Sequence, residues 1–121
     1  MSNSLFPSGQ WVGFYTYTGR PSRFLMDLLL EFKNGVMSGE GADGIGSFSV
    51  SGIYSAENNE CSWRKQYVVR HSLIYRGFRE KKGVWGTWAI STITGGFHIW
   101  PLSDGGPLPV IEEEREAINC I

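Results

Sequence analysis

The sequence has few of the residues that favour helices, that cross-link small domains or that give a chain a strong net charge. Alanine is scarce, and the longest apolar run, residues 24–30, is interrupted by Asp27 and is far too short to cross a bilayer as a helix. Only two cysteines occur, Cys61 and Cys120, so a disulfide framework is not indicated and free thiols in a reducing compartment are favoured. The net charge of -1 argues against general nucleic-acid binding.

The N-terminus also lacks a basic region followed by an apolar run, so no signal peptide is predicted. We therefore expect a cytoplasmic protein that makes no membrane contact. A length of 121 residues indicates one domain, which can bury a sizeable core without disulfides or metal. The predicted organisation is an N-terminal arm in residues 1–9, a β-barrel domain in residues 10–101, and a C-terminal loop with a short helix in residues 102–121.

Glycine, aromatic and β-branched residues are abundant instead, with 16 glycines and 14% aromatic residues, and this composition is typical of β-sheet proteins. Residues 23–32 give the clearest strand pattern, because five apolar side chains from Phe24 to Phe32 alternate onto one face. Asn34-Gly35 and Asp43-Gly44 are typical hairpin turns. Residues 92–96 are predicted to be a loop. Strands are predicted at residues 10–18, 23–32, 36–42, 47–54, 84–91 and 97–101, with two more in a central stretch.

This central stretch, residues 60–79, is dense in aromatic, basic and β-branched residues. It is too long for one strand, because strands usually run about 3–10 residues. We expect a hairpin that turns at residues 68–71, with Lys65 and Tyr67 on one face of its first arm and Tyr75 on one face of its second. The eight short strands predict an all-β fold, an eight-stranded antiparallel up-and-down β-barrel. Pro109 before a glutamate-rich run adds a short C-terminal helical tail.

The segments GQWVGFY, SFSVSGIY, SLIYRG and VWGTWAI follow one another along the chain at a strand-like spacing. In these segments, residues 10–101 resemble the small avidin-like and lipocalin-like (calycin-type) meander barrels, in which a Gly-x-Trp opens the barrel and Ser/Thr-Gly-x-Tyr and Gly-x-Trp motifs recur. The resemblance implies a binding barrel. The biotin-contacting residues of avidin-like proteins have no residue-by-residue match here, so the resemblance implies no particular ligand.

Polar residues on the expected inner face are the first candidate site. Lysine and tyrosine donate hydrogen bonds and histidine can donate or accept them, so a cluster of these residues at one end of the lumen suits an anion or a carbonyl-bearing ligand. The alternative is structural: the tyrosines bury their rings, and Lys65 pairs with a carboxylate such as Glu40. The predicted ligand-binding residues are Tyr15, Tyr17, Lys65, Tyr67, His71, Tyr75 and Trp88.

The five tryptophans are the second candidate, although most should lie in the core or cover the barrel ends. Trp85 and Trp100 lie opposite the apolar faces of their strands, so we expect them to be exposed, as at a protein–protein surface. With Ile111 and Ile118 of the tail they form the predicted interface. Four arginines and one glutamine are expected on a solvated outer face rather than in a nucleic-acid site. They are Arg64, Gln66, Arg70, Arg76 and Arg79.

Three functions follow from these candidates. The leading prediction is a non-enzymatic β-barrel binding protein that holds a small ligand in or at the mouth of the barrel. The alternative is a protein–protein interaction or assembly module with a filled barrel, acting as a homo-oligomer or with another partner. The third is a small barrel isomerase or lyase with His71 and a tyrosine as acid and base. No cofactor and no metal site is predicted, because phosphate loops and dinucleotide fingerprints are absent and the Asp43 segment has too few carboxylates for a calcium loop.

Overall fold

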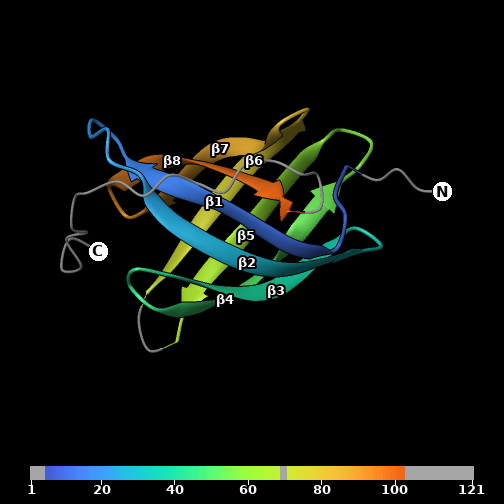
Figure 1. Cartoon of the computed structure of the whole chain (residues 1–121), viewed down its shortest axis with the longest axis horizontal. Helices are drawn as coiled ribbons and strands as arrows, with labels where there is room; N and C mark the ends of the chain where they lie inside the picture. Colours follow the sequence, from blue (N-terminus) through green and yellow to red (C-terminus); the bar gives the residue numbers. More distant parts are fainter. Residues whose placement is uncertain (1–4, 69–70, 103–121) are drawn as a thin grey trace.

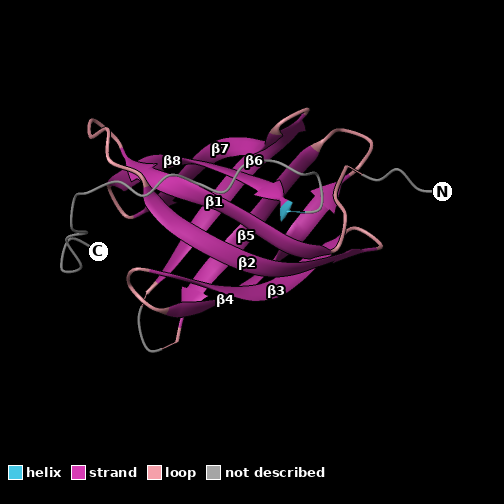
Figure 2. Ribbon diagram, in the orientation of Figure 1, coloured by secondary structure: helices cyan, strands magenta, loops and turns pink. Residues whose placement is uncertain are grey.

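A computed structural model describes residues 5–68 and 71–102. Its strands form one closed antiparallel barrel, in which each strand pairs with the next and β8 pairs with β1 (Figures 1 and 2). The all-β fold and the up-and-down strand order predicted from the sequence are therefore confirmed, whereas the predicted helix in the tail lies outside the described residues. The strands are β1 (Gly9–Tyr17), β2 (Phe24–Lys33), β3 (Val36–Asp43), β4 (Ser47–Ser55), β5 (Glu60–Tyr67), β6 (Ser72–Glu80), β7 (Gly83–Ile90) and β8 (Ile93–Pro101).

The barrel has two ends that differ in what covers them. At the end on the left of Figure 1 lie the connections β1–β2, β3–β4, β5–β6 and β7–β8. We call it the ion-pair end, after the Lys65–Asp43 pair described below. At the opposite end lie the connections β2–β3, β4–β5 and β6–β7, together with the start of β1. We call it the arm end, because residues 5–8 fold against it.

Alternation along the strands decides which side chains enter the lumen. In β2, Met26, Leu28 and Leu30 are buried, whereas Asp27 and Leu29 between them are exposed. This is the period-two burial expected when one face of a strand lies on a core. On β1, whose two faces are both apolar, the buried set that joins the lumen core is Trp11, Tyr15 and Tyr17.

The arm end is closed by the N-terminal arm. Phe6 is only 2% exposed, and its ring centroid lies 5.3 Å from that of Phe32 and 5.2 Å from that of Tyr54. Arg79 donates hydrogen bonds to the carbonyl oxygen of Leu5 and, over 2.6 Å, to that of Glu80. The expectation that Arg79 lies on a solvated outer face is wrong, because β6 turns its odd-numbered residues inward.

The last strand is longer than the sequence pattern predicts. Strand β8 begins at Ile93, so residues 93–96, predicted to be loop, belong to the sheet. Gly95 pairs with Tyr17 and Trp88, and Gly96 with Thr16 and Thr87. Two glycines in succession are typical of a turn, but here Gly95 lets the ring of Trp88 approach the backbone closely.

Candidate functional site

The centre of the lumen at the ion-pair end is an ion pair between Lys65 on β5 and Asp43 at the end of β3. The Nζ atom of Lys65 lies 2.6 Å from Oδ2 of Asp43, and both side chains are fully buried. Taking two charges out of water carries a large desolvation cost, which the attraction between them offsets only when the remaining polar atoms are also satisfied. The groups around the pair therefore determine whether it is stable.

The β3–β4 turn fixes the carboxylate. Oδ1 of Asp43 accepts hydrogen bonds from the backbone N–H groups of Ile45 (2.9 Å) and Gly46 (3.4 Å). The backbone N–H of Asp43 in turn donates to the carbonyl oxygen of Gly46 over 3.1 Å. An aspartate that bonds to the backbone two residues on is a common turn former, so the same side chain shapes the turn and presents Oδ2 to the lumen.

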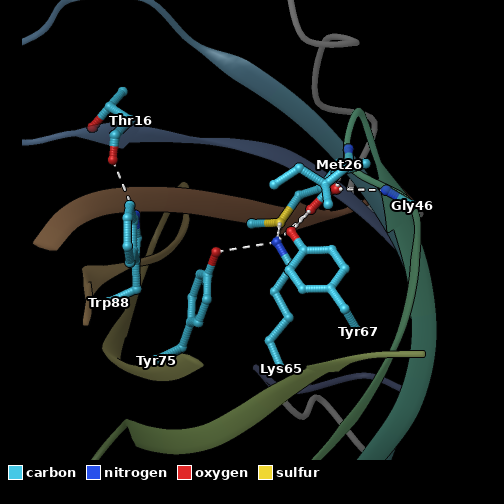
Figure 3. A network of polar contacts seen from close by, with 9 residues as sticks. Thr16, Met26, Gly46, Lys65, Tyr67, Tyr75 and Trp88 are labelled. Carbon is cyan, nitrogen blue, oxygen red and sulfur yellow. Dashed lines mark hydrogen bonds and ion pairs between the residues drawn. The ribbon is translucent and has the colours of Figure 1, made fainter. Parts of the chain in front are cut away.

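Two tyrosine hydroxyls complete the polar cluster (Figure 3). Tyr67 donates its hydroxyl to Oδ2 of Asp43 over 2.6 Å, and Nζ of Lys65 donates to the hydroxyl oxygen of Tyr75 over 3.2 Å. Nζ also lies 3.7 Å from the sulfur atom of Met26. We call Asp43, Lys65, Tyr67 and Tyr75 the lumen cluster. Every charged atom in it has at least one short polar contact.

Aromatic rings surround the ammonium group as well. Nζ of Lys65 lies 4.5 Å from the ring centroids of both Tyr15 and Phe48. Cation–π contacts gain strength when the cation is desolvated, and are then worth about 2 kcal/mol. The lysine is thus held by a carboxylate, a hydroxyl and aromatic rings.

The seven predicted ligand-binding residues all lie toward this end of the barrel. The ring of Trp88 contacts Tyr15, Tyr17 and Tyr75 at centroid separations of 6.2, 5.2 and 6.4 Å, and its Nε1 donates to the carbonyl oxygen of Thr16 over 3.0 Å. The ring of His71 lies 5.2 Å from that of Tyr67. The structure therefore brings the predicted residues together.

Asp43 is the member of the cluster that sequence reasoning missed. The carboxylate suggested for Lys65 was Glu40, which is exposed. The sequence did contain a signal, because the odd-numbered residues of β3 share one side of the strand. That side carries Gly39, Gly41 and Asp43 as well as the buried Met37. An odd-numbered acid at the end of that strand was the better candidate partner.

The lumen is filled by its own side chains. Trp63 and Tyr75 stack with ring centroids 4.3 Å apart, and the ring of Phe97 lies 4.9 Å from that of Tyr75. Lys65, Trp63 and Tyr75 are each at most 1% exposed. In the described part of the chain, a ligand centred in the lumen would have to displace these groups.

The buried thiol does not offer a nucleophile. Burial raises the pKa of Cys61 to about 12, with smaller opposing contributions from hydrogen bonds to the Gly77 backbone and the Trp63 side chain. Because the thiolate is the reactive form, Cys61 is inert at neutral pH. Cys120 lies outside the described residues. Within residues 5–68 and 71–102, no group of three or more His, Cys, Asp or Glu side chains is arranged to hold a metal ion.

A groove on the outside of the barrel is the second candidate site. It has a volume of about 710 Å³ and crosses the outer face of β1, β8 and β7, between the β1–β2 loop and the β6–β7 turn. We call it the aromatic groove. It is lined by Phe14, Thr16, Arg20, Pro21, Arg23, Lys81, Lys82, Trp85, His98 and Trp100.

His98 is the central ring of this groove. It stacks on Trp85 with centroids 3.6 Å apart and an interplanar angle of 10°, and it meets the edge of Phe14 at 5.9 Å. Nε2 of His98 lies 2.6 Å from the carbonyl oxygen of Lys82, and because a carbonyl can only accept, Nε2 carries the proton. Burial lowers the pKa of His98, with the charge of Arg23 acting in the same direction.

The predicted interface residues differ in their exposure. Trp85 is 43% exposed, as expected, but Trp100 is only 8% exposed, so the expectation of an exposed Trp100 is wrong. Trp100 is covered because its ring packs against His98 at 4.8 Å and edge-on against Phe14 at 6.4 Å. Ile111 and Ile118 lie outside the described residues.

The fold is a closed antiparallel meander barrel, consistent at fold level with the calycin-like barrels, and it has a charged cluster inside and an aromatic groove outside. Comparison of the chain with family models, with curated proteins and with solved structures gave no match in any of the three. Over the described ranges, no helix is long and apolar enough to cross a membrane.

Proposed function

We propose that this protein is a protein–protein interaction module, in which the filled barrel is a rigid scaffold and the partner binds the outer face around Trp85. The observation that carries the proposal is the packing of the lumen by Trp63, Lys65 and Tyr75, combined with a large aromatic side chain exposed beside a groove. A filled lumen leaves the outside as the surface on which a partner can be recognised.

Exposed apolar side chains continue from Trp85 along the outside of the barrel. Phe78 on β6 lies directly opposite Trp85 on β7 in the strand register and is 57% exposed. Ile53 is 64% exposed and lines a shallow depression with Phe78. Contiguous exposed apolar side chains of this size are typical of surfaces that bind other proteins. Phenylalanine and tryptophan are also enriched at such interfaces.

Sedimentation velocity over a range of concentrations tests the proposal for the case in which the partner is a second copy of the chain. We expect the wild type to associate and the Phe78→Ser/Trp85→Ser variant to remain monomeric. Leu29→Ser is the matched control, because Leu29 is equally exposed on β2, outside the groove and the Ile53–Phe78 depression. For a different partner, a photo-crosslinker in place of Phe78 should give a product that Trp85→Ser removes. A monomeric wild type without such a product contradicts the proposal.

A second candidate function is small-ligand binding at the ion-pair end. It is favoured by the lumen cluster, which places an ammonium group and two tyrosine hydroxyls beneath the half-buried apolar residues Phe24, Ile45, Ile90 and Ile93. A ligand with an anionic or carbonyl group would displace Asp43 or share its partners. Native mass spectrometry beside a denatured control tests this function. Extra mass that is lost on denaturation supports it, and a bare protein mass in both spectra counts against it.

A further inference from the structure

We propose that the aromatic groove binds an acidic peptide segment that carries an apolar side chain. This inference rests on the proposed interaction function and names the chemistry of the partner. Its basis is the arrangement of rings, cations and empty space on the outer face of β1, β7 and β8.

The floor of the groove is a row of three rings that the strand register puts in line. Phe14 pairs with His98 across β1 and β8, and His98 pairs with Trp85 across β8 and β7. The neighbouring row is Thr16, Gly96 and Thr87, which carries no large side chain. A Cβ atom built on Gly96 would find no other atom closer than 3.6 Å. The register therefore leaves a hollow at Gly96 beside the rings, next to Thr16 of the groove lining.

Cations flank the floor on both sides. Arg20 and Arg23 come from the β1–β2 loop, and Lys81 and Lys82 come from the β6–β7 turn. Among the described residues, those that line the groove include no carboxylate, although the chain as a whole has a net charge of -1. The guanidinium group of Arg23 lies 4.5 Å from the ring centroid of Phe14, which holds this charge beside the apolar floor. Positive charges on both sides of an apolar floor complement an apolar side chain with acidic neighbours.

The rings favour a peptide over single-stranded nucleic acid. Nucleic-acid sites of that kind stack successive bases on several exposed aromatic faces. Here Trp85 is well exposed, but His98 and Trp100 are buried against each other and against Phe14. One exposed ring gives no continuous stacking platform. The net charge of the chain provides no long-range attraction for a polyanion either.

A suitable probe can be taken from the chain itself. Residues 109–121, which lie outside the described residues, read PVIEEEREAINCI and combine four glutamates with isoleucines. The probe is a fluorescein-labelled synthetic peptide of this sequence with Cys120→Ser. Its glutamine analogue carries glutamine in place of the four glutamates, so that Arg115 is its only charged side chain. Fluorescence anisotropy against the full chain gives the affinity of each peptide.

We expect the glutamine analogue to bind at least about ten-fold more weakly than the acidic probe, and the affinity of the probe to fall as salt is raised. Lys81→Gln/Lys82→Gln should also weaken binding about ten-fold. Lys33→Gln/Arg64→Gln, which removes the same charge from exposed sites outside the groove, should change it less than about two-fold. Gly96→Val should weaken binding by filling the hollow.

Each remaining outcome has a defined meaning. If the probe binds only to a full chain whose own four glutamates are replaced by glutamine, the groove takes an acidic segment and the chain's own segment competes for it. If both peptides bind equally and Trp85→Ser abolishes both, the outer face is an interaction site but the acidic class is overturned. If neither peptide binds either form of the chain, the inference is overturned, while the sedimentation and cross-linking tests still decide the proposed function.

Discussion

Burial of the Lys65 charge costs desolvation free energy, and the polar groups around the charge offset this cost. The ammonium group has the carboxylate of Asp43 at 2.6 Å and the hydroxyl of Tyr75 at 3.2 Å, and its own side chain is 0% exposed. A buried pair of this kind is often no more stabilising than apolar residues of the same volume, but removal of one partner leaves an uncompensated charge. The lumen cluster is therefore more sensitive to single substitutions than to paired ones.

A comparison of a single with a paired substitution at the ion pair tests this sensitivity. Lys65→Met should lower the free energy of unfolding by about 3–5 kcal/mol, because it strands the Asp43 carboxylate. Lys65→Met/Asp43→Asn should lose less than Lys65→Met alone, since the new amide is neutral and its oxygen can keep the bonds from the β3–β4 turn. Urea unfolding at pH 7 measures both. The control Arg64→Met, on the opposite face of β5, should change the free energy by less than about 0.5 kcal/mol. A double variant less stable than Lys65→Met contradicts the argument.

His98 makes stability depend on pH in a defined direction. Its pKa is lowered from 6.5, first by burial, so the unfolded chain binds this proton more readily than the folded one. The contribution of His98 is complete above pH 6.5 and is lost progressively as pH falls below that value toward the folded pKa. Wild-type stability should therefore fall as the pH is lowered below 6.5, and it should fall less in His98→Gln, which keeps a donor for the Lys82 carbonyl. His71 is present in both proteins. An equal fall in both would show that His98 is not responsible.

At the scale of the strands, hydrophobic alternation predicted the fold. It also predicted which face points inward in those strands whose other face is polar. Strand β2 is the clearest case, and the same period placed Lys65, Tyr67 and Tyr75 in the lumen. Alternation could not indicate that Trp100 is covered, because its cover comes from Phe14 and His98 on two strands. The role of Asp43 was missed for a similar reason, since it depends on a partner on another strand.

The start of β8 was missed because glycine pairs usually end strands. Gly95 is required by its surroundings: a Cβ there would meet the carbonyl oxygen of Thr16 and lie 2.5 Å from the ring of Trp88. Gly95→Ala should lower the free energy of unfolding by about 1–3 kcal/mol through overpacking. Gly96→Ala is the adjacent control, with 3.6 Å to its nearest neighbours, and should change it by less than about 0.5 kcal/mol. Chemical denaturation of the two variants compares them directly, and equal losses would mean that the close approach of Trp88 is unimportant.

At the scale of the whole molecule, the barrel is closed in two ways. Strands β1 and β8 pair over seven residues and remove the free sheet edges. The arm then covers one end. There Phe6 packs on both Phe32 and Tyr54, Trp11 donates from Nε1 to the carbonyl oxygen of Pro7 over 3.0 Å, and Arg79 binds the carbonyl oxygen of Leu5. The arm is thus part of the core at this end of the barrel.

Removal of the Phe6 ring tests whether the arm is part of the core. Phe6→Ala should lower the free energy of unfolding by about 3–5 kcal/mol, because it deletes a buried ring and leaves a cavity beneath the arm. Leu5→Ala is the matched control: Leu5 is 45% exposed and its backbone carbonyl, which Arg79 binds, is unchanged, so the loss should stay below about 1 kcal/mol. Hydrogen exchange should also show faster exchange at the N–H of Phe32, which donates to the Ser8 side chain over 2.9 Å, in Phe6→Ala but not in Leu5→Ala. If Phe6→Ala is as stable as Leu5→Ala and this exchange is unchanged, the Phe6 ring is not what holds the arm against the barrel.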